Sequence, residues 1–152
     1  MKEKRKVFII QSVRGATKAE REFAISHAAR LENSSYEVYL PARNTNQNDP
    51  VGLRICTDNR KAIANADEIH IIWKKNNLNW FQKLLSWFVG KIQKWGGLQK
   101  SEGSYFDFGM SFMAQHFLPD KKIILVNLDM IKPTGGKSFE NVLHALTKRS
   151  RK

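Results

Sequence analysis

The chain has 152 residues, of which 41% are hydrophobic and 11% aromatic, and it carries a formal net charge of +12. This length fits one domain, and the apolar fraction is too high for a disordered chain. The one cysteine, Cys56, excludes a disulfide framework and a multi-cysteine zinc site. Because no segment resembles a signal peptide or reaches the roughly 18 apolar residues of a membrane span, we expect a cytoplasmic protein.

The predicted elements alternate between strands and helices. Short apolar runs predict four strands, at about residues 6–11, 36–40, 68–73 and 121–127. Helical spacing of apolar residues predicts four helices, at about 17–32, 52–65, 104–118 and 138–148. Thr17 and Glu20 have the spacing of a capping box, and Ser138 can cap the last helix. This alternation predicts an α/β, Rossmann/flavodoxin-like three-layer fold with a parallel sheet of four to five strands.

The pattern also predicts which positions are buried. On the second helix we expect burial of Leu53, Cys56, Ile63 and Ala66, and on the last helix of Phe139, Val142, Leu143 and Leu146. His70 alternates with isoleucines on the third strand and is expected to be a hydrogen-bonded core histidine. Residues 42–50 are predicted to form a polar loop.

The positive charge is concentrated in three segments. Residues 1–6 carry a net charge of +3, residues 148–152 carry +4, and residues 74–100 carry +6 without an acidic residue. We interpret 74–100 as an insertion in a single domain spanning 1–152. Within it, residues 78–95 predict a basic amphipathic helix. Such a helix can pack on its own domain or on a second copy, cover a pocket as a lid, or lie on an anionic membrane, and the basic tails attract any polyanion.

Ligands of parallel α/β sheets bind beyond the carboxyl ends of the strands. This rule selects Ser12–Gly15, the region 74–107 and the chain from Asn127 onward. In the first of these, the hydroxyl of Ser12, the guanidinium of Arg14 and the amides of the turn at Gly15 form a candidate phosphate site. The start of the third helix offers a second set of hydroxyls and amides, from Ser101, Gly103 and Ser104, although ordinary helix capping also explains them.

Asp107 is the strongest candidate for a chemical role. It lies in an aromatic stretch, Tyr105-Phe106-Asp107-Phe108-Gly109, where a carboxylate is costly to bury without a partner. The alternative is an acidic residue stabilised by the dipole of its helix. Asp58 and Asn59 lie on the second helix, and either can face the same pocket or serve only local polarity.

The order and spacing of these motifs resemble the nucleoside 2-deoxyribosyltransferase superfamily, and within it the 2′-deoxynucleoside 5′-phosphate N-hydrolases. The resemblance covers about residues 6–127 without the insertion. In those hydrolases a Ser-Ile-Arg-Gly turn binds the 5′-phosphate, and here Ser12-Val13-Arg14-Gly15 matches it. A second phosphate-binding serine stands six residues before the catalytic Glu of an aromatic-Glu-aliphatic-Gly motif. Here Ser101 stands six residues before Asp107 in Phe106-Asp107-Phe108-Gly109.

Three positions depart from the family pattern. The nucleophile position holds Asp107 rather than Glu. The family's second carboxylate, eight residues before the Asp that starts the third strand, falls on Asn59, with Asp58 one residue further away. Phe8 stands on the first strand where the hydrolases carry an aromatic hydroxyl.

The resemblance implies cleavage or transfer of the N-glycosidic bond of a (deoxy)nucleoside or its 5′-monophosphate. Asp107 would be the nucleophile, Asp58 or Asn59 the partner on the base side, and Ser12, Arg14 and Ser101 the phosphate-binding residues. The family needs no metal or cofactor, and it implies a homo-oligomer. Two other hypotheses are open: a nucleotide-binding sensor of the same fold that does not cleave, and a peripheral membrane or polyanion-binding protein acting through 78–95 and the tails.

Overall fold

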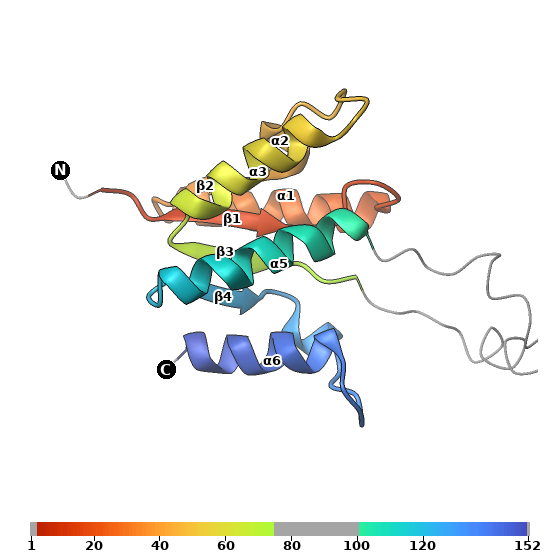
Figure 1. Cartoon of the computed structure of the whole chain (residues 1–152), viewed down its shortest axis with the longest axis vertical. Helices are drawn as coiled ribbons and strands as arrows, with labels where there is room; N and C mark the ends of the chain where they lie inside the picture. The colour runs from red at the N-terminus through yellow and green to blue at the C-terminus, as the bar shows by residue number, and fades with distance from the viewer. Residues whose placement is uncertain (1–2, 75–100, 152) are drawn as a thin grey trace, which may run out of the picture.

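The computed structural model describes residues 3–74 and 101–151, in which strands and helices alternate as predicted. The four strands are β1 (Lys6–Ile10), β2 (Glu37–Tyr39), β3 (Glu68–Ile71) and β4 (Lys122–Leu125). They are all parallel and lie in the order β2-β1-β3-β4 (Figure 1). The helices are α1 (Lys18–Asn33), α2 (Pro41–Asn44), α3 (Leu53–Asn65), α5 (Glu102–Phe117) and α6 (Phe139–Ser150), with a 3₁₀ turn, η1 (Leu128–Met130). The predicted α/β fold class is confirmed.

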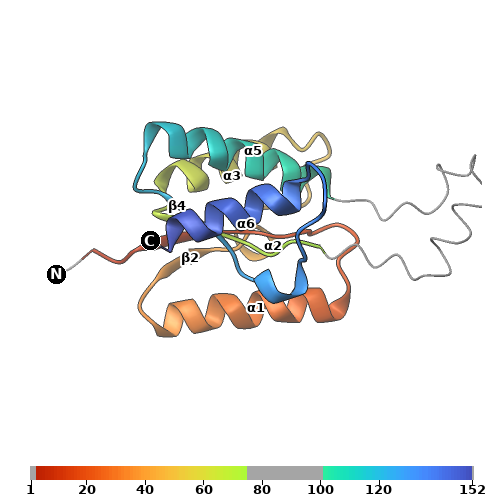
Figure 2. The ribbon, with the colours of Figure 1, turned by 90° about the horizontal axis from the view of Figure 1, so that it is seen from below.

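The sheet lies between α1 on one side and α3 and α5 on the other (Figure 2). On one face, Ala24 and Ala28 of α1 pack against alternate residues of β1, Val7 and Ile9. On the other face, α3 and α5 cover a larger core formed by Phe8, Ile10, Ile63, Ile69, Ile71, Phe108, Ile123 and Leu125. Because strand side chains alternate between the two faces, strands covered on both sides are apolar throughout, as β1 is.

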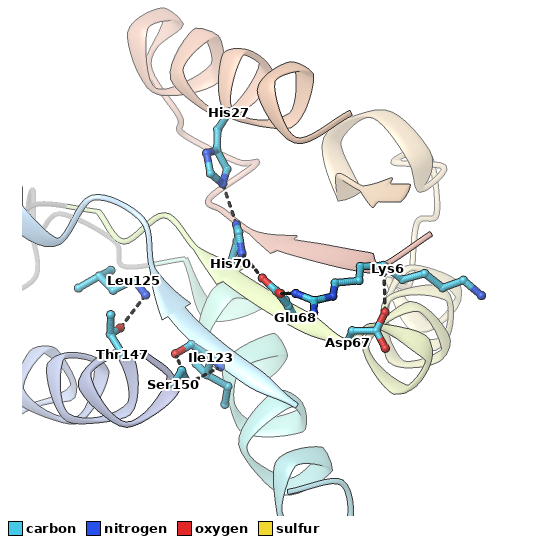
Figure 3. A network of polar contacts seen from close by, with 10 residues as sticks. Lys6, His27, Asp67, Glu68, His70, Ile123, Leu125, Thr147 and Ser150 are labelled. Atoms are coloured by element: carbon cyan, nitrogen blue, oxygen red, sulfur yellow. Dashed lines mark hydrogen bonds and ion pairs between the residues drawn. The ribbon is translucent and has the colours of Figure 1, made fainter. Parts of the chain in front are cut away.

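Helix α6 lies beside β4, at the edge where a further strand would pair (Figure 1). The backbone N–H groups of β4 that point away from β3 donate to its side chains: Leu125 N to Thr147 Oγ1 at 2.7 Å, and Ile123 N to Ser150 Oγ at 3.0 Å (Figure 3). Ser150 Oγ also donates to Ile123 O at 3.1 Å. Within the described residues, the sheet therefore ends at four strands because a helix satisfies the backbone of its edge.

Most predicted helix starts are confirmed, and one predicted loop is wrong. Thr17 and Glu20 form a reciprocal capping box, and Ser138 Oγ accepts a hydrogen bond from Asn141 N. The loop predicted from residue 42 instead begins with the single helical turn of α2. Its first residue is Pro41, whose fixed φ and missing N–H suit the first position of a helix.

Four positions expected to be buried are not. Leu53 is 70% exposed and Cys56 is half-buried, because burial on α3 starts only in its second half, at Asn59. Phe139 and Val142 are 46% and 41% exposed. A helix placed at the sheet edge turns only a narrow stripe inward, and on α6 that stripe is Leu143, Leu146 and Thr147.

His70 is a buried, hydrogen-bonded histidine, as predicted. Its Nε2 lies 3.1 Å from Glu68 Oε2, and its Nδ1 lies 2.9 Å from Nε2 of His27 on α1 (Figure 3). Burial, followed by the neighbouring His70 and Arg30, lowers the pKa of His27 to about 4, so the His27 ring is neutral at pH 7.

The basic amphipathic helix expected at 78–95 lies outside the described residues. None of the helices within 3–74 and 101–151 has the length and hydropathy of a transmembrane span.

Candidate functional site

The loops at the carboxyl ends of β1 and β3 are tied together by direct contacts. The chain leaves β1 through a turn at Arg14 and Gly15, where Gly15 adopts a φ of +68°, a conformation that glycine adopts without strain. Ser12 Oγ donates to Arg14 O at 2.9 Å within this turn. Lys74, which follows β3, donates from Nζ to Gly15 O at 3.2 Å. The two loops thus place a hydroxyl and an ammonium side by side.

The start of α5 faces these loops across a small hollow. The hollow has a volume of about 10 Å³ and is lined by Ser12, Ile72, Trp73, Lys74, Ser101, Ser104 and Tyr105. Ser101 caps α5, and its Oγ accepts from Ser104 N at 3.4 Å. The buried hydroxyl of Ser104 has no hydrogen-bond partner among the described residues. The positive end of a helix, a lysine and the hydroxyl of Ser104 form a setting that suits an anion.

A larger groove adjoins the hollow and shares Ser12, Ile72, Trp73 and Lys74 with it. Its volume is about 500 Å³, which is in the size range of pockets for small organic ligands. Asn127, which follows β4, fixes its floor: its side chain accepts from Trp73 N at 3.0 Å and donates to Trp73 O at 2.8 Å. The three loops that the sequence selected therefore meet at one edge of the sheet.

Asp107 lies one helical turn after Ser104 on α5, and Asn59 of α3 faces it. The two side chains are 7% and 5% exposed. Asn59 Nδ2 donates to the carboxylate, 3.1 Å from Oδ2 and 3.3 Å from Oδ1. Burial raises the pKa of Asp107 to about 6, and the hydrogen bond from Asn59 opposes part of that rise. Asp107 is thus a carboxyl group that changes charge close to neutral pH.

Behind Asn59, a second polar pair extends the contact. Thr45 Oγ1 donates to Asn59 Oδ1 at 3.0 Å, and the hydroxyl of Tyr39 lies 2.7 Å from Thr45 Oγ1. The ring of Tyr39 stacks on Phe8 of β1 with centroids 5.5 Å apart. A continuous polar line therefore runs from the end of β2 through α3 to the carboxylate on α5.

The structure separates the two alternatives on α3. Asp58 turns away from Asp107 and forms an ion pair with Arg54, 3.8 Å from Oδ2 to Nε, with its side chain 36% exposed. Asn59 is the residue of this pair that contacts Asp107. Sequence spacing alone left the two open because neighbouring helical residues point about 100° apart, and either can face a given pocket.

The remaining predicted residues are distributed around the hollow. Ser12, Ser101 and Ser104 line it together. Arg14 is exposed in its turn, and Gly103 is exposed in the first turn of α5. Neither Arg14 nor Asp107 lines the hollow or the groove. The serine hydroxyls around the hollow and the Asn59–Asp107 pair therefore lie close together along α5. They do not line the same hollow or groove.

Sequence reasoning named none of four residues of this region individually, although the selected region 74–107 begins with Lys74. Trp73 and Lys74 line both the hollow and the groove, and their position directly after a buried strand was the available signal. Tyr39 and Thr45 are brought to the Asn59–Asp107 pair by the tertiary fold, and no local sequence pattern indicates this contact. In residues 3–74 and 101–151, no cluster of three or more histidine, cysteine or acidic side chains is arranged to hold a metal ion.

Comparison with known proteins gives few matches. No protein-family model matches the chain, and no curated protein matches it. Among solved structures, the CMP N-glycosidase BcmB of Clostridium botulinum is similar, with a TM-score of 0.48 and 18% sequence identity, over 94% of this chain and 83% of that chain. Functional residues cannot be transferred by position at this level of similarity, so the contacts described above are the basis on which the function is proposed.

Proposed function

We propose that this protein cleaves or transfers the N-glycosidic bond of a (deoxy)nucleoside 5′-monophosphate, with Asp107 acting at the anomeric carbon. One observation carries the proposal: α5 holds, one turn apart, residues suited to bind an anion and a buried carboxyl group whose pKa is raised. A 5′-nucleotide carries a phosphate at one end of its pentose and a glycosidic carbon at the other.

The side chains around the hollow at the start of α5, rather than its small volume, support binding of the phosphate. Ser12, Ser101 and Ser104 supply hydroxyls, Lys74 supplies a positive charge, and the start of α5 adds the positive end of a helix dipole. The unpartnered hydroxyl of Ser104 would gain a hydrogen bond from a phosphate oxygen. Arg14, exposed in the neighbouring turn, is expected to add a second charge from outside.

The spacing on α5 supports the placement of the sugar. Ser104 and Asp107 are three residues apart, which on an α-helix is a rise of about 5 Å. A pentose whose 5′-phosphate is held at Ser104 would extend along the helix toward Asp107. The amide of Asn59 has two N–H donors, of which one suffices to hold the carboxylate and the other can donate to the base.

The reaction follows from the charge that develops. As the bond between C1′ and the base nitrogen breaks, its electron pair leaves with the base, which takes up a proton from water. Asp107, ionised, stabilises the positive sugar or bonds to C1′. Water then adds to C1′, the bond to Asp107 breaks with its electron pair returning to the carboxylate, and a proton is released to solvent. The products are the free base and the sugar phosphate, while a second base in place of water gives transfer.

A second candidate, a nucleotide-binding module without cleavage, is favoured by one specific observation. Both carboxylate oxygens of Asp107 lie within reach of Asn59, and the groove of about 500 Å³ that borders Ser12, Trp73 and Lys74 does not include Asp107. A ligand can therefore occupy the groove with its anionic end in the hollow and leave the carboxylate untouched.

A panel of nucleosides and nucleoside 5′-monophosphates, with free base measured by chromatography, tests the proposal. We expect base release from at least one monophosphate, a loss of about 100-fold or more in Asp107→Asn, and no comparable loss in Asp58→Asn, the same chemical change on the solvent side of α3. Lys74→Gln should raise KM for the monophosphate more than for the nucleoside.

The same panel distinguishes the two candidates. If the wild-type protein releases no base but calorimetry detects nucleotide binding that Lys74→Gln weakens and Asp107→Asn leaves unchanged, the binding module is correct and the enzymatic proposal is wrong. Equal base release by wild type and Asp107→Asn would also reject Asp107 as the reacting group.

A further inference from the structure

Tyr39 lies on β2, separated from α5 by α3, yet its hydroxyl belongs to the environment of Asp107. The hydrogen bonds from Tyr39 to Thr45, from Thr45 to Asn59 and from Asn59 to Asp107 form an unbroken line. Thr45, Asn59 and Asp107 are each less than 9% exposed, so water does not compete freely for these groups.

The donor and the acceptor of each hydrogen bond in this line follow from the carboxylate of Asp107 at its end. A carboxylate accepts, so the amide nitrogen of Asn59 faces Asp107 and the amide oxygen faces Thr45. The amide oxygen of Asn59 can only accept, so Thr45 donates its one hydroxyl hydrogen to it. The oxygen of Thr45 is then left to accept, and Tyr39 is the donor of the 2.7 Å contact.

The backbone fixes both ends of the line. Tyr39 is the register partner of Phe8, and the two rings stack at an interplanar angle of 16°, which holds the phenol in place. Thr45 ends α2, where its N–H bonds Pro41 O. A flip of the Asn59 amide would set its oxygen against the carboxylate and its N–H₂ group against a Thr45 hydroxyl already held by Tyr39.

We propose that Tyr39 is a positioning residue for Asp107: its hydroxyl orients Thr45, which locks the Asn59 amide with its donor toward the carboxylate. An effect of the Tyr39 hydroxyl on turnover rests on the proposed function, whereas its effect on the ionisation of Asp107 does not. The line places no charge beside the carboxylate and supplies it only with a hydrogen-bond donor.

Charged side chains on the elements packed around Asp107 are directed elsewhere. On α3, Asp58 pairs with Arg54, and Arg60 is exposed. On α2, Arg43 pairs with Glu32 at 2.6 Å. On α5, Glu102 is exposed in the first turn. Among the described residues, the hydrogen bond from Asn59 is therefore the contact that favours the ionised form of Asp107 against its burial.

The test is titration of the Asp107 carboxyl carbon by NMR in wild type and Tyr39→Phe. The variant keeps the ring on Phe8 and removes only the hydroxyl, so the fold is expected to persist. We expect the pKa of Asp107 to rise by about half a unit, because a weakened donor stabilises the carboxylate less. Thr45→Val should raise it further, and Thr45→Ser, which keeps the hydroxyl, should restore the wild-type value.

Tyr36→Phe is the matched control, since it removes a tyrosine hydroxyl just ahead of the same strand and outside this line of hydrogen bonds. An unchanged Asp107 titration in both Tyr39→Phe and Thr45→Val, or an equal shift in Tyr36→Phe, would overturn the proposal. If the wild-type protein releases base, Tyr39→Phe should lower kcat with little change in KM and move the acidic limb of the pH profile upward. If it releases none, the proposed function fails while the titration still decides the role of Tyr39.

Discussion

The carboxyl group of Asp107 is held where its charged form is costly. It is almost fully buried, and within residues 3–74 and 101–151 it has no ion-pair partner and one amide supplies the hydrogen bonds of its side chain. Stability alone would select an amide or an apolar residue at such a position, since an ionised group loses its hydration there. A side chain kept in spite of that cost is typical of groups that act on a ligand.

Replacement of Asp107 by Asn should therefore stabilise the fold in a pH-dependent way. The folded-state pKa lies above the ordinary value of 3.8, at about 6, so the wild-type carboxyl favours folding below pH 3.8 and that benefit is lost as pH rises through 6. The shift of roughly two units corresponds to about 3 kcal/mol at pH 8. Urea denaturation at pH 8 should show Asp107→Asn as the more stable protein, with the difference vanishing near pH 4. A variant that is less stable at both pH values would contradict this account.

At the scale of elements, Lys121 closes the carboxyl end of α3 from another part of the chain. Its side chain is 4% exposed, and Nζ donates to Ile63 O at 3.0 Å and also to Ala64 O and Ala66 O. Burial lowers the pKa of this lysine, and the nearby Asp67 opposes the effect. The last carbonyls of α3, which a helix cannot satisfy internally, thus receive an ammonium from the residue that precedes β4.

Lys121→Met should leave those carbonyls without a donor and lower the free energy of unfolding by about 1–3 kcal/mol. Lys122→Met, the same substitution at the next, exposed position, is the control and is expected to change stability little. Urea denaturation midpoints of the two variants provide the comparison, and equal midpoints would show that the carbonyls do not depend on Lys121.

The elements themselves were accessible from the sequence because local chemistry determines them. The strand Lys122–Leu125 contains three consecutive apolar residues, two of them β-branched isoleucines, and Thr17 with Glu20 forms the capping box that their spacing indicates. The turn of α2 was missed because its four residues carry no apolar period. The exposure of Leu53 was missed because it depends on how far α3 overhangs the core, which no local pattern encodes.

The candidate site was accessible only in part. Ser101 caps α5, and Ser104 and Asp107 follow at intervals of three residues, so their spacing alone places neighbouring members one turn apart. The choice between Asp58 and Asn59 needed the crossing of α3 over α5. The contribution of Tyr39 and Thr45 needed the β1–β2 register and the turn of α2, which bring together positions far apart in the chain.

At the scale of the whole molecule, α6 and the sheet depend on two side-chain hydroxyls. Thr147 is 1% exposed, and its Oγ1 accepts the outward N–H of Leu125. A buried amide that loses its acceptor keeps the full cost of its lost hydration. The attachment of the last helix to the edge strand is accordingly polar as well as apolar.

Thr147→Val, which preserves shape and removes the acceptor, should lower the free energy of unfolding by about 1–3 kcal/mol. Thr57→Val, on α3, is a matched control because Thr57 Oγ1 only donates to Leu53 O within its own helix. Thermal unfolding of the two variants should show the larger loss for Thr147→Val, and protection of the Leu125 amide from hydrogen exchange should fall with it.

The closed borders of the sheet restrict how copies of this chain can meet. One border is sealed by Thr147 and Ser150, and the other is β2, only three residues long and followed closely by Pro41. Neither offers the long free ladder on which strand exchange or fibril growth begins. Among the described residues, exposed apolar side chains lie instead on a helical surface, where Phe106, Met113 and Phe117 of α5 are each more than half exposed.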